Sequence, residues 1–341
     1  MNDEVMVSIC CITYNQEQYI KDALESFLNQ KTSYKYEIIV RDDASTDNTV
    51  NIIREYEKKY PDIIKPIYEE VNGKLKGVRR GFNVTFDKAK GKYIALCEGD
   101  DYWISEYKLQ KQVDYMENNP DCTFCFHNAN ILYMKSNKIK KFTKRPIVPY
   151  KKFDSKNGNY NGANIHLFAM GGAPTASFMF RKEDAKDFPN WYYDAPCGDL
   201  PLKLFMTSKG YAHYIDEVLS VYRRETGTSV TDNWKKEQEK NIEISQKRIN
   251  NLIKLLDEFD LYTNYEYKDG LDISREIYLM DLKVIENKYK EIVKDKKMKH
   301  YYKIKHNDIL GIKLFIRAYF PKIYSFLKKI FRKYYLLKRI A

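Results

Sequence analysis

Three carboxylates stand within four consecutive residues of this chain, Glu98-Gly99-Asp100-Asp101, after an apolar run and before Tyr102-Trp103. Carboxylates this close repel one another, so such a cluster commonly exists to hold a cation. Oxygen-only ligands favour Mg²⁺ or Mn²⁺, which bind through one or two carboxylates together with substrate phosphates. The alternative is a solvated acidic turn that caps the next helix, and the spacing alone weighs both interpretations equally.

Two weaker polar clusters also follow apolar runs. Asp42-Asp43 precedes Ser45-Thr46, a pattern that in isolation favours helix capping over ligand binding. Tyr14 follows the first apolar run, where an aromatic side chain is more often part of a rim than a platform for a base. Neither cluster assigns a function without the elements around it.

These elements alternate between strands and helices. Apolar runs predict strands over residues 5–13, 36–40, 63–68, 93–97 and 122–127. Helices are predicted from a cap at Asn15 to about 30, after 47, over 81–90 and over 106–118. This alternation predicts an α/β fold with a doubly wound, mostly parallel sheet. Ligands of such sheets bind beyond the carboxyl ends of the strands, where the three polar clusters lie.

The pattern loosens after residue 135. A long loop is predicted over 138–164, followed by short strands at 176–180, 212–215 and 219–222. Helices are predicted over 200–208, from 234 onward and over 272–293. We therefore expect one α/β domain over 1–232, with halves 1–135 and 136–232, then a helical extension over 233–295 and a tail over 296–341.

Three motifs together resemble the family 2 inverting glycosyltransferases with the Rossmann-like GT-A fold. They are Val7-Ser8-Ile9-Cys10-Cys11-Ile12-Thr13-Tyr14-Asn15, Asp42-Asp43-Ala44-Ser45-Thr46-Asp47-Asn48-Thr49 and Gly91-Lys92-Tyr93-Ile94-Ala95-Leu96-Cys97-Glu98-Gly99-Asp100-Asp101. The resemblance covers 1–135 well, 170–225 loosely and nothing beyond about 232. It implies a hexosyl- or N-acetylhexosaminyl-transferase of bacterial surface-polysaccharide assembly, which uses a nucleotide-sugar, with UDP as the expected nucleotide, and a glycan or lipid-linked glycan acceptor.

The resemblance also implies roles by position. Asp100 matches the metal-ligating acid, with Asp101 beside it, and Glu98 replaces the usual first Asp with a longer arm. Asp43 matches the residue that binds the uracil edge. The other residues expected around the nucleotide are Thr13, Tyr14, Asn15, Arg79, Arg80, Asn83 and Gly99.

The catalytic base of the resembled family is an acid ahead of a helix, and Asp199 in Cys197-Gly198-Asp199-Leu200 fits that position. Gly198 replaces the usual preceding Glu, and an acid there is also an ordinary helix cap. As a base, Asp199 would take a proton from the acceptor hydroxyl in one inverting displacement. Arg223 and Arg224 suit diphosphate oxygens, although they also fit a surface loop held by Glu225. The 222–229 loop lacks the His that the resembled family often has there as a third metal ligand.

The net charge of +12 is concentrated in the tail. Residues 296–341 carry fourteen Lys or Arg and one acid, Asp308, which is +13 and leaves −1 for the rest. Apolar residues recur there with helical spacing, at 323, 326, 327, 330, 331, 334 and 337. A basic amphipathic helix of this kind favours an anionic membrane surface, contacted by 309–341. The alternatives are packing on the enzyme or in a dimer; a nucleic-acid partner is disfavoured, because the apolar face would be wasted.

Six cysteines without zinc-ligand spacing predict buried, reduced thiols. The acidic N-terminus lacks the apolar core of a secretory signal, and no apolar stretch is long enough to span a membrane. We expect a cytoplasmic enzyme, peripheral on the inner face of the membrane, with a possible homodimer contact through 233–295. Two alternatives remain: a sugar nucleotidyltransferase, although the Gly-rich phosphate loop is missing, and a membrane-docked partner protein with a degenerate nucleotide site.

Overall fold

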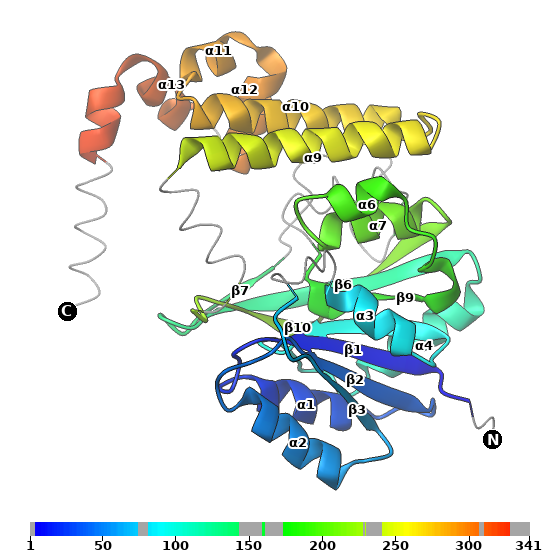
Figure 1. Cartoon of the computed structure of the whole chain (residues 1–341). Helices are drawn as coiled ribbons and strands as arrows, with labels where there is room; N and C mark the ends of the chain where they lie inside the picture. Colours follow the sequence, from blue (N-terminus) through cyan, green and yellow to red (C-terminus); the bar gives the residue numbers. More distant parts are fainter. Residues whose placement is uncertain are drawn as a thin grey trace.

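A ten-stranded, mostly parallel sheet forms the centre of the part of the chain that the structure describes (Figure 1). The computed structural model describes residues 4–73, 81–142, 159–160, 173–227, 229, 241–306 and 310–327. Strand order is β3-β2-β1-β4-β9-β6-β10-β5, with β7 on β6 and β8 on β10. The strands are β1 Val7–Thr13, β2 Tyr36–Asp42, β3 Ile64–Tyr68, β4 Tyr93–Glu98, β5 Tyr102–Trp103, β6 Cys122–Tyr133, β7 Lys138–Lys141, β8 Asn159–Tyr160, β9 Met179–Arg181 and β10 Tyr211–Arg224.

The first half has the predicted βαβ organisation. Strands β3, β2, β1 and β4 pair in parallel. Val7, Ile9 and Cys11 of β1 face one hydrophobic core, and Cys10 faces the other, so both faces of the strand are buried. The helices of this half are α1 Ile20–Leu28, α2 Thr49–Lys59, α3 Gly81–Lys88 and α4 Lys108–Asn118. The fold-class prediction is confirmed.

The second half departs from the local predictions in three places. Strands β7 and β8 lie within the long loop predicted over 138–164, paired with β6 and β10. The predicted strand over 176–180 is a 3₁₀ turn, Thr175–Ser177, followed by β9, which runs antiparallel to β4 and β6. The two strands predicted at 212–215 and 219–222 are one continuous strand, β10, with irregular register near 215–218. Exposed Asp216 and Glu217 interrupt the apolar pattern there, which explains the wrong prediction.

Two helix boundaries also differ from the predictions. Helix α1 begins at Ile20, not at Asn15, which has a positive φ of 51° and lies in the preceding loop. The helix predicted over 272–293 is divided into α10, Lys268–Ile285, and α11, Tyr289–Lys294, with Asn287 at φ 57° between them. The remaining helices are α6 Asn190–Asp194, α7 Asp199–Thr207, α9 Ile242–Tyr262, α12 Lys296–Lys305 and α13 Ile312–Tyr319.

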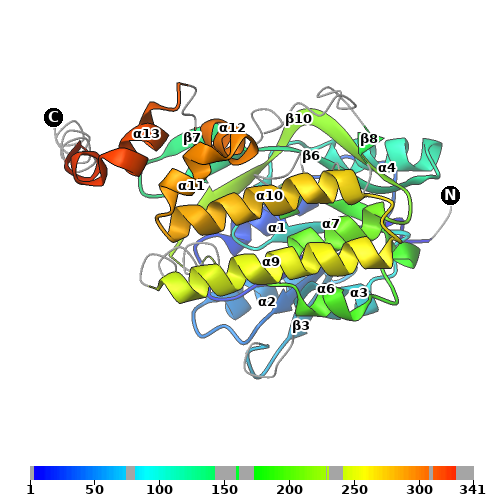
Figure 2. The same ribbon diagram turned by 90° about the horizontal axis from the view of Figure 1, so that it is seen from above.

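The C-terminal helices pack on the α/β sheet domain instead of standing apart from it (Figures 1 and 2). Leu255, Leu256 and Phe259 of α9 belong to the same core as Trp191 and Phe205. The Trp191 and Phe259 ring centroids are 5.5 Å apart. Helices α10 to α13 share a smaller core that includes Ile277, Met280, Ile292, Tyr302 and Leu314. Helix α9 and the preceding domain therefore share one hydrophobic core.

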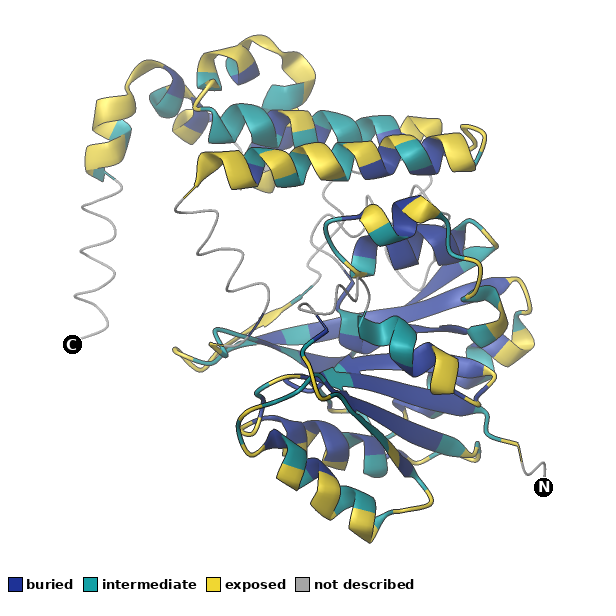
Figure 3. Ribbon diagram, in the orientation of Figure 1, coloured by how far each residue is buried: buried dark blue, intermediate teal, exposed yellow. Residues whose placement is uncertain are grey.

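Burial follows this arrangement (Figure 3). The sheet is buried, whereas the outer faces of α2 and α9 are exposed. All six cysteine thiols are unpaired, and all except half-buried Cys197 are buried. None of the described helices is long and apolar enough to cross a membrane.

Lys108 is buried in α4 without a hydrogen-bond partner for its ammonium group among the described residues. Its Nζ lies 4.0 Å from the Trp103 ring centroid. Burial lowers the pKa of Lys108 to about 7, because the charged form loses its hydration, and the nearby Cys97 and Cys125 oppose this shift only in part. The fold therefore favours neutral Lys108, whereas the unfolded chain protonates it up to a much higher pH.

We expect Lys108→Met to stabilise the protein at pH 7 by on the order of 3 kcal/mol. The advantage should shrink by up to about 1.4 kcal/mol per pH unit between pH 7 and 9, because over that range the unfolded wild-type chain still binds a proton that the folded chain has released, so the stability of the wild type rises with pH. Urea denaturation at several pH values measures the difference. Lys111→Met, on an exposed site of the same helix, is the control and should change stability little. An advantage that does not vary with pH would contradict the assignment.

Candidate active site

The acidic turn, residues 98–101, joins β4 to β5 at the carboxyl end of the parallel strands. The Gly99 amide donates to the Ile12 carbonyl at 2.9 Å, and the Asp101 amide donates to the Glu98 carbonyl at 3.0 Å. A Cβ on Gly99 would lie 2.5 Å from Gln16 Oε1 and 2.9 Å from Thr13 Oγ1. The turn therefore packs directly on the loop after β1, with no room for a side chain at Gly99.

The carboxylates of the acidic turn are held in a buried environment. Asp100 and Asp101 are buried, and Asp101 Oδ1 accepts a 2.8 Å hydrogen bond from the Arg223 amide. Burial, followed by the charge of Asp100, raises the pKa of Asp101 well above its usual value. Burial and then Asp100 also raise the pKa of Glu98 to about 8, although a hydrogen bond with the Thr175 side chain opposes this shift. Three acids that repel one another here would be stabilised by a cation.

The donor set fits a divalent metal bound through few protein ligands. Three buried oxygens around the turn lack hydrogen-bond partners among the described residues: Thr13 Oγ1, Gln16 Oε1 and Glu98 Oε2. No group of three or more acids, histidines or cysteines with metal-binding geometry occurs in the described part of the chain. Asp100 and Asp101 would therefore hold Mn²⁺ or Mg²⁺ with additional oxygens from a ligand, as these ions are commonly held with phosphates.

Asp43 lies at the end of β2, next to Thr13 at the end of β1. The Asp43 amide donates to the Thr13 carbonyl at 3.0 Å. Its carboxylate accepts from buried Arg41 at 2.5 Å and from the Gly73 amide at 2.8 Å. Asp42 instead accepts from the amide and hydroxyl of Ser45. The two acids of this pair thus have different partners: Asp42 closes the turn after β2, and Asp43 binds the backbone at Gly73.

Asn15 connects the loops after β1 and β2. Its side-chain oxygen accepts from the Thr46 amide at 2.7 Å, and its own amide donates to Ser45 Oγ at 2.9 Å. Tyr14 beside it is 42% exposed, which leaves its ring accessible to a ligand. The structure thus shows a stapling role for Asn15; its contact with a nucleotide stays a prediction.

Asp199 is the first residue of α7, and the structure brings it close to the acidic turn. The charge of Asp199 contributes to the raised pKa of Glu98, so the two carboxylates interact across the site. Lys203 Nζ lies 3.2 Å from Asp199 Oδ2. Burial acts to raise the pKa of Asp199, but Lys203 outweighs it, and the pKa is lowered overall. A Cβ on Gly198 would meet none of the described residues within 4 Å, which leaves space beside Asp199 in this part of the structure.

Arg223 points into the protein. Its guanidinium donates to the Asp100 carbonyl at 3.1 Å and pairs with Asp22. It also lies over the rings of Tyr102 and Tyr19, at 4.4 and 5.2 Å from their centroids. Arg223 therefore packs against the acidic turn through buried contacts, and its contact with a diphosphate stays a prediction.

The other predicted cationic residues are placed in part. Arg224 is half-buried over the Tyr222 ring, and its Nε is buried without a hydrogen-bond partner among the described residues. Asn83 of α3 accepts a 2.9 Å hydrogen bond from the Tyr192 hydroxyl, which ties α3 to α6. Arg79 and Arg80 lie outside the described residues.

A family model for glycosyl transferase family 2 matches residues 8–187. This chain belongs to glycosyl transferase family 2. The matched segment contains Thr13, Asp43 and the acidic turn, and it ends before Asp199. The family match thus includes the acidic turn but not Asp199, whose role as a base stays a prediction.

The matches to two relatives cover only part of each relative's length. An uncharacterised protein of Mycobacterium tuberculosis is 35% identical over 222 residues, 64% of this chain and 58% of the relative. A putative teichuronic acid biosynthesis glycosyltransferase of Bacillus subtilis is 32% identical over 145 residues, 42% of this chain and 55% of the relative. This chain therefore spans less than two thirds of the length of these relatives.

The fold is also found in a mannosyltransferase of Pyrobaculum calidifontis, solved in complex with GDP-Man and Mn²⁺. The TM-score is 0.53, with 16% identity, over 97% of this chain and 89% of that one. At this identity the likeness establishes the GT-A fold.

Four residues of this family 2 site were missed by the sequence analysis. Thr175 and Asp22 contact site residues from distant elements, so no local pattern marks them. Lys203 follows Asp199 by one helical turn, a spacing that does predict contact once a helix is assigned. Gln16 follows the first motif directly, but only the close approach of Gly99 reveals its position.

We expect Gly99→Ala to disrupt the site, because the added methyl group must displace Gln16 or Thr13. Denaturation should show that the free energy of unfolding falls by about 1–3 kcal/mol. The affinity for UDP with Mn²⁺, measured by ligand-induced stabilisation, should fall more than about tenfold. Gly198→Ala is the matched control, since it meets open space and should retain wild-type behaviour in both measurements. Equal behaviour of the two variants would contradict this packing.

Proposed function

We propose that the protein is a metal-dependent inverting glycosyltransferase that moves a sugar from a nucleotide-sugar, most simply a UDP-sugar, to a hydroxyl of a glycan or lipid-linked glycan. The observation that carries the proposal is the buried acidic turn at the ends of the parallel strands, where Asp100 and Asp101 lie beside oxygens, unpaired among the described residues, of Thr13, Gln16 and Glu98. An anionic metal site and a separate acid beside it match the two needs of glycosyl transfer: stabilising the leaving diphosphate and activating the acceptor.

The donor half of the reaction is assigned to three strand ends. Tyr14 offers an exposed ring to the base, Asp43 offers a carboxylate edge, and Thr13 joins them through its carbonyl. Asp100 and Asp101 would hold Mn²⁺ or Mg²⁺ beside the diphosphate. The bound ion would supply charge stabilisation for the leaving diphosphate. The buried surroundings of the turn strengthen this interaction, since they exclude water.

The acceptor half of the reaction is assigned to Asp199. Lys203 lowers the pKa of Asp199 against the effect of burial, so its carboxylate is ionised at neutral pH and able to accept a proton. An acceptor hydroxyl placed in the open space beside Gly198 would lose its proton to Asp199 as its oxygen attacks the anomeric carbon. Attack from the face opposite the diphosphate inverts the configuration.

A membrane surface is the proposed location of the acceptor. Several large apolar side chains near the C-terminus are exposed, and we call them the C-terminal patch: Leu310, Ile312, Phe315, Phe320, Ile323 and Phe326. The patch lies on the side of the molecule toward which the parallel strands run (Figures 1 and 2). Basic residues 328–339, which would extend it, lie outside the described residues. Contact with the inner leaflet would thus bring lipid-linked acceptors to the side of the donor site.

One relative supports the proposed role in surface-polysaccharide assembly. The Bacillus subtilis relative is named as a putative teichuronic acid biosynthesis glycosyltransferase. Exposed apolar residues on α9, Ile242, Ile244 and Leu261, keep a homodimer through 233–295 as a prediction.

Substituting the two key acids should separate donor binding from chemistry. Asp199→Asn should lower metal-dependent hydrolysis of a UDP-sugar by about 10²–10⁴-fold, because proton transfer is lost, while UDP affinity stays near wild type. Asp100→Asn should abolish metal-dependent UDP binding as well. A panel of nucleotide-sugars, followed by release of nucleoside diphosphate and by calorimetry, measures both effects.

Asp62→Asn, on an exposed turn, is the control for these variants and should behave as wild type. Full activity of Asp100→Asn would refute the metal site. A wild-type protein that neither binds nor hydrolyses any donor would refute the proposed activity and favour the partner protein with a degenerate site.

Negative charges introduced into the C-terminal patch test the proposed membrane docking. Phe320→Glu with Phe326→Glu should weaken binding to phosphatidylglycerol vesicles more than about tenfold, because two inserting rings are replaced by anions. Flotation or sedimentation with vesicles measures the change. Leu261→Glu with Tyr265→Glu, at and just after the C-terminal end of α9, adds the same charge to exposed sites outside the patch and should have little effect. Equal losses in both pairs would contradict the patch.

A further inference from the structure

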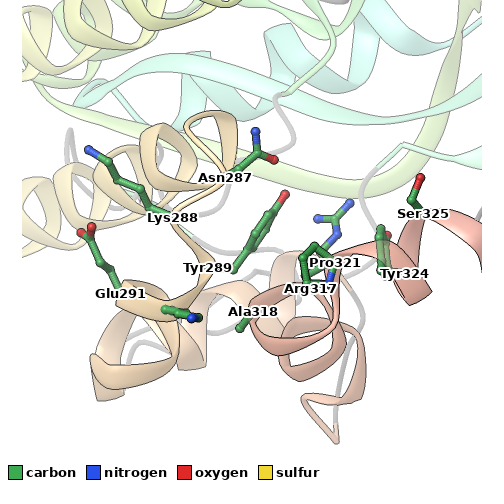
Figure 4. Close-up of a pocket in the computed structure, with 10 residues that line it drawn as sticks. Asn287, Lys288, Tyr289, Glu291, Arg317, Ala318, Pro321, Tyr324 and Ser325 are labelled. Atoms are coloured by element: carbon green, nitrogen blue, oxygen red, sulfur yellow. The ribbon is translucent and has the colours of Figure 1, made fainter.

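A cavity of about 650 Å³ lies between α11 and the C-terminal helical segments (Figure 4). It is lined by residues within 287–291 and 317–325, and we call it the C-terminal pocket. Its volume lies in the range of small-molecule sites. None of the residues assigned to glycosyl transfer lines it, so it calls for a separate ligand.

Arg317 is the central cation of the C-terminal pocket. Its guanidinium lies between two rings, 5.0 Å from the Tyr289 centroid and 4.4 Å from the Tyr324 centroid. Figure 4 shows these three side chains next to one another. One nitrogen donates to the Tyr302 hydroxyl at 3.0 Å. Arg317 is half-buried, and no carboxylate among the described residues pairs with it. The Arg317 guanidinium, stacked between the two rings, is thus oriented to bind an anion that the described residues do not supply.

The rest of the lining is rich in donors. Lys290 adds a second cation without a carboxylate partner in the described part of the chain, and Ser325 adds a hydroxyl. The one acid of the lining, Glu291, is already paired with Lys283 at 2.9 Å. Several donors around one cavity suit the oxygens of a phosphate group, which accepts from many directions at once.

The neighbouring surface indicates which phosphate compound would enter. The C-terminal pocket is lined from this segment by residues 317, 318, 321, 324 and 325. The neighbouring residues Phe320, Ile323 and Phe326 are exposed members of the C-terminal patch. A ligand with its phosphate in the pocket would therefore place its other end against apolar side chains. An acyl chain matches that surface, and a free anion does not.

We propose that the C-terminal pocket binds the phosphate of an anionic lipid headgroup while the C-terminal patch inserts beside it. This inference rests on the membrane docking in the proposed function and deepens it, because it replaces general attraction to a charged surface with a specific lipid site. The Arg317 fork would contact two phosphate oxygens, and Lys290 a third.

The test compares charge inside and outside the C-terminal pocket in the full chain. Arg317→Gln and Lys290→Gln should each weaken binding to phosphatidylglycerol vesicles by more than about tenfold, as expected for a charge-assisted contact. Lys322→Gln removes the same charge from an exposed position on the same segment, outside the pocket, and should weaken binding by about fivefold at most. Lys290 is exposed, so its variant guards against a folding defect in Arg317→Gln.

A second arm separates a lipid headgroup from a soluble phosphate compound. Glycerol phosphate without vesicles should bind only at millimolar concentration, and Arg317→Gln should abolish that binding. Micromolar binding of glycerol phosphate, together with unchanged vesicle binding by Arg317→Gln, would overturn the lipid assignment. If all three variants lose vesicle affinity equally, the pocket has no specific role. If the wild type binds no vesicles, both the membrane docking and the lipid site are refuted. The assays of the Asp100 and Asp199 variants would still decide the glycosyltransferase activity.

Discussion

The contact between Asp101 and Arg223 holds the two halves of the sheet domain together at the site. Asp101 is buried and accepts from the Arg223 amide, and the Arg223 side chain donates to the Asp100 carbonyl. A buried carboxylate without such partners would cost several kcal/mol, so the acidic turn needs β10 beside it. The sheet provides this position, because β10 pairs with β6 on one edge and β5 on the other. The contacts of the acidic turn are therefore complete only when residues more than a hundred positions later have joined the sheet.

This dependence explains which parts of the molecule were predictable. The strands β1, β2 and β4 and the acidic turn follow from local signals: continuous apolar runs, the helices between them and a polar cluster at a strand end. Their register then brings Thr13, Asp43 and Glu98 to one edge, as the general rule for parallel sheets requires. No alignment of side chains was needed for that prediction, because the geometry of a parallel sheet supplies it.

What escaped prediction depends on partners distant in the sequence. Asn15 resembles a helix cap, but its side chain bonds Thr46 in another loop, and the helix begins five residues later. Arg223 is buried against Asp22 and Tyr102, two contacts that no local pattern predicts, whereas its contact with a diphosphate stays a prediction. β10 reads as two strands because exposed Asp216 and Glu217 break its pattern, although pairing with β6 continues across them. In each case a long-range contact outweighs the local preference.

The shared core of the C-terminal helices has a consequence for how the site and the C-terminal surface are related. Phe259 of α9 packs on Trp191 of α6, and α6 is followed directly by α7, which begins with Asp199. The same packing therefore positions the proposed base and supports α10, on which the core of α11 to α13 is built. Because these helices share cores with one another and with the α/β domain, a lipid bound at the proposed C-terminal pocket would hold the acceptor side of the proposed active site in a defined orientation to the membrane.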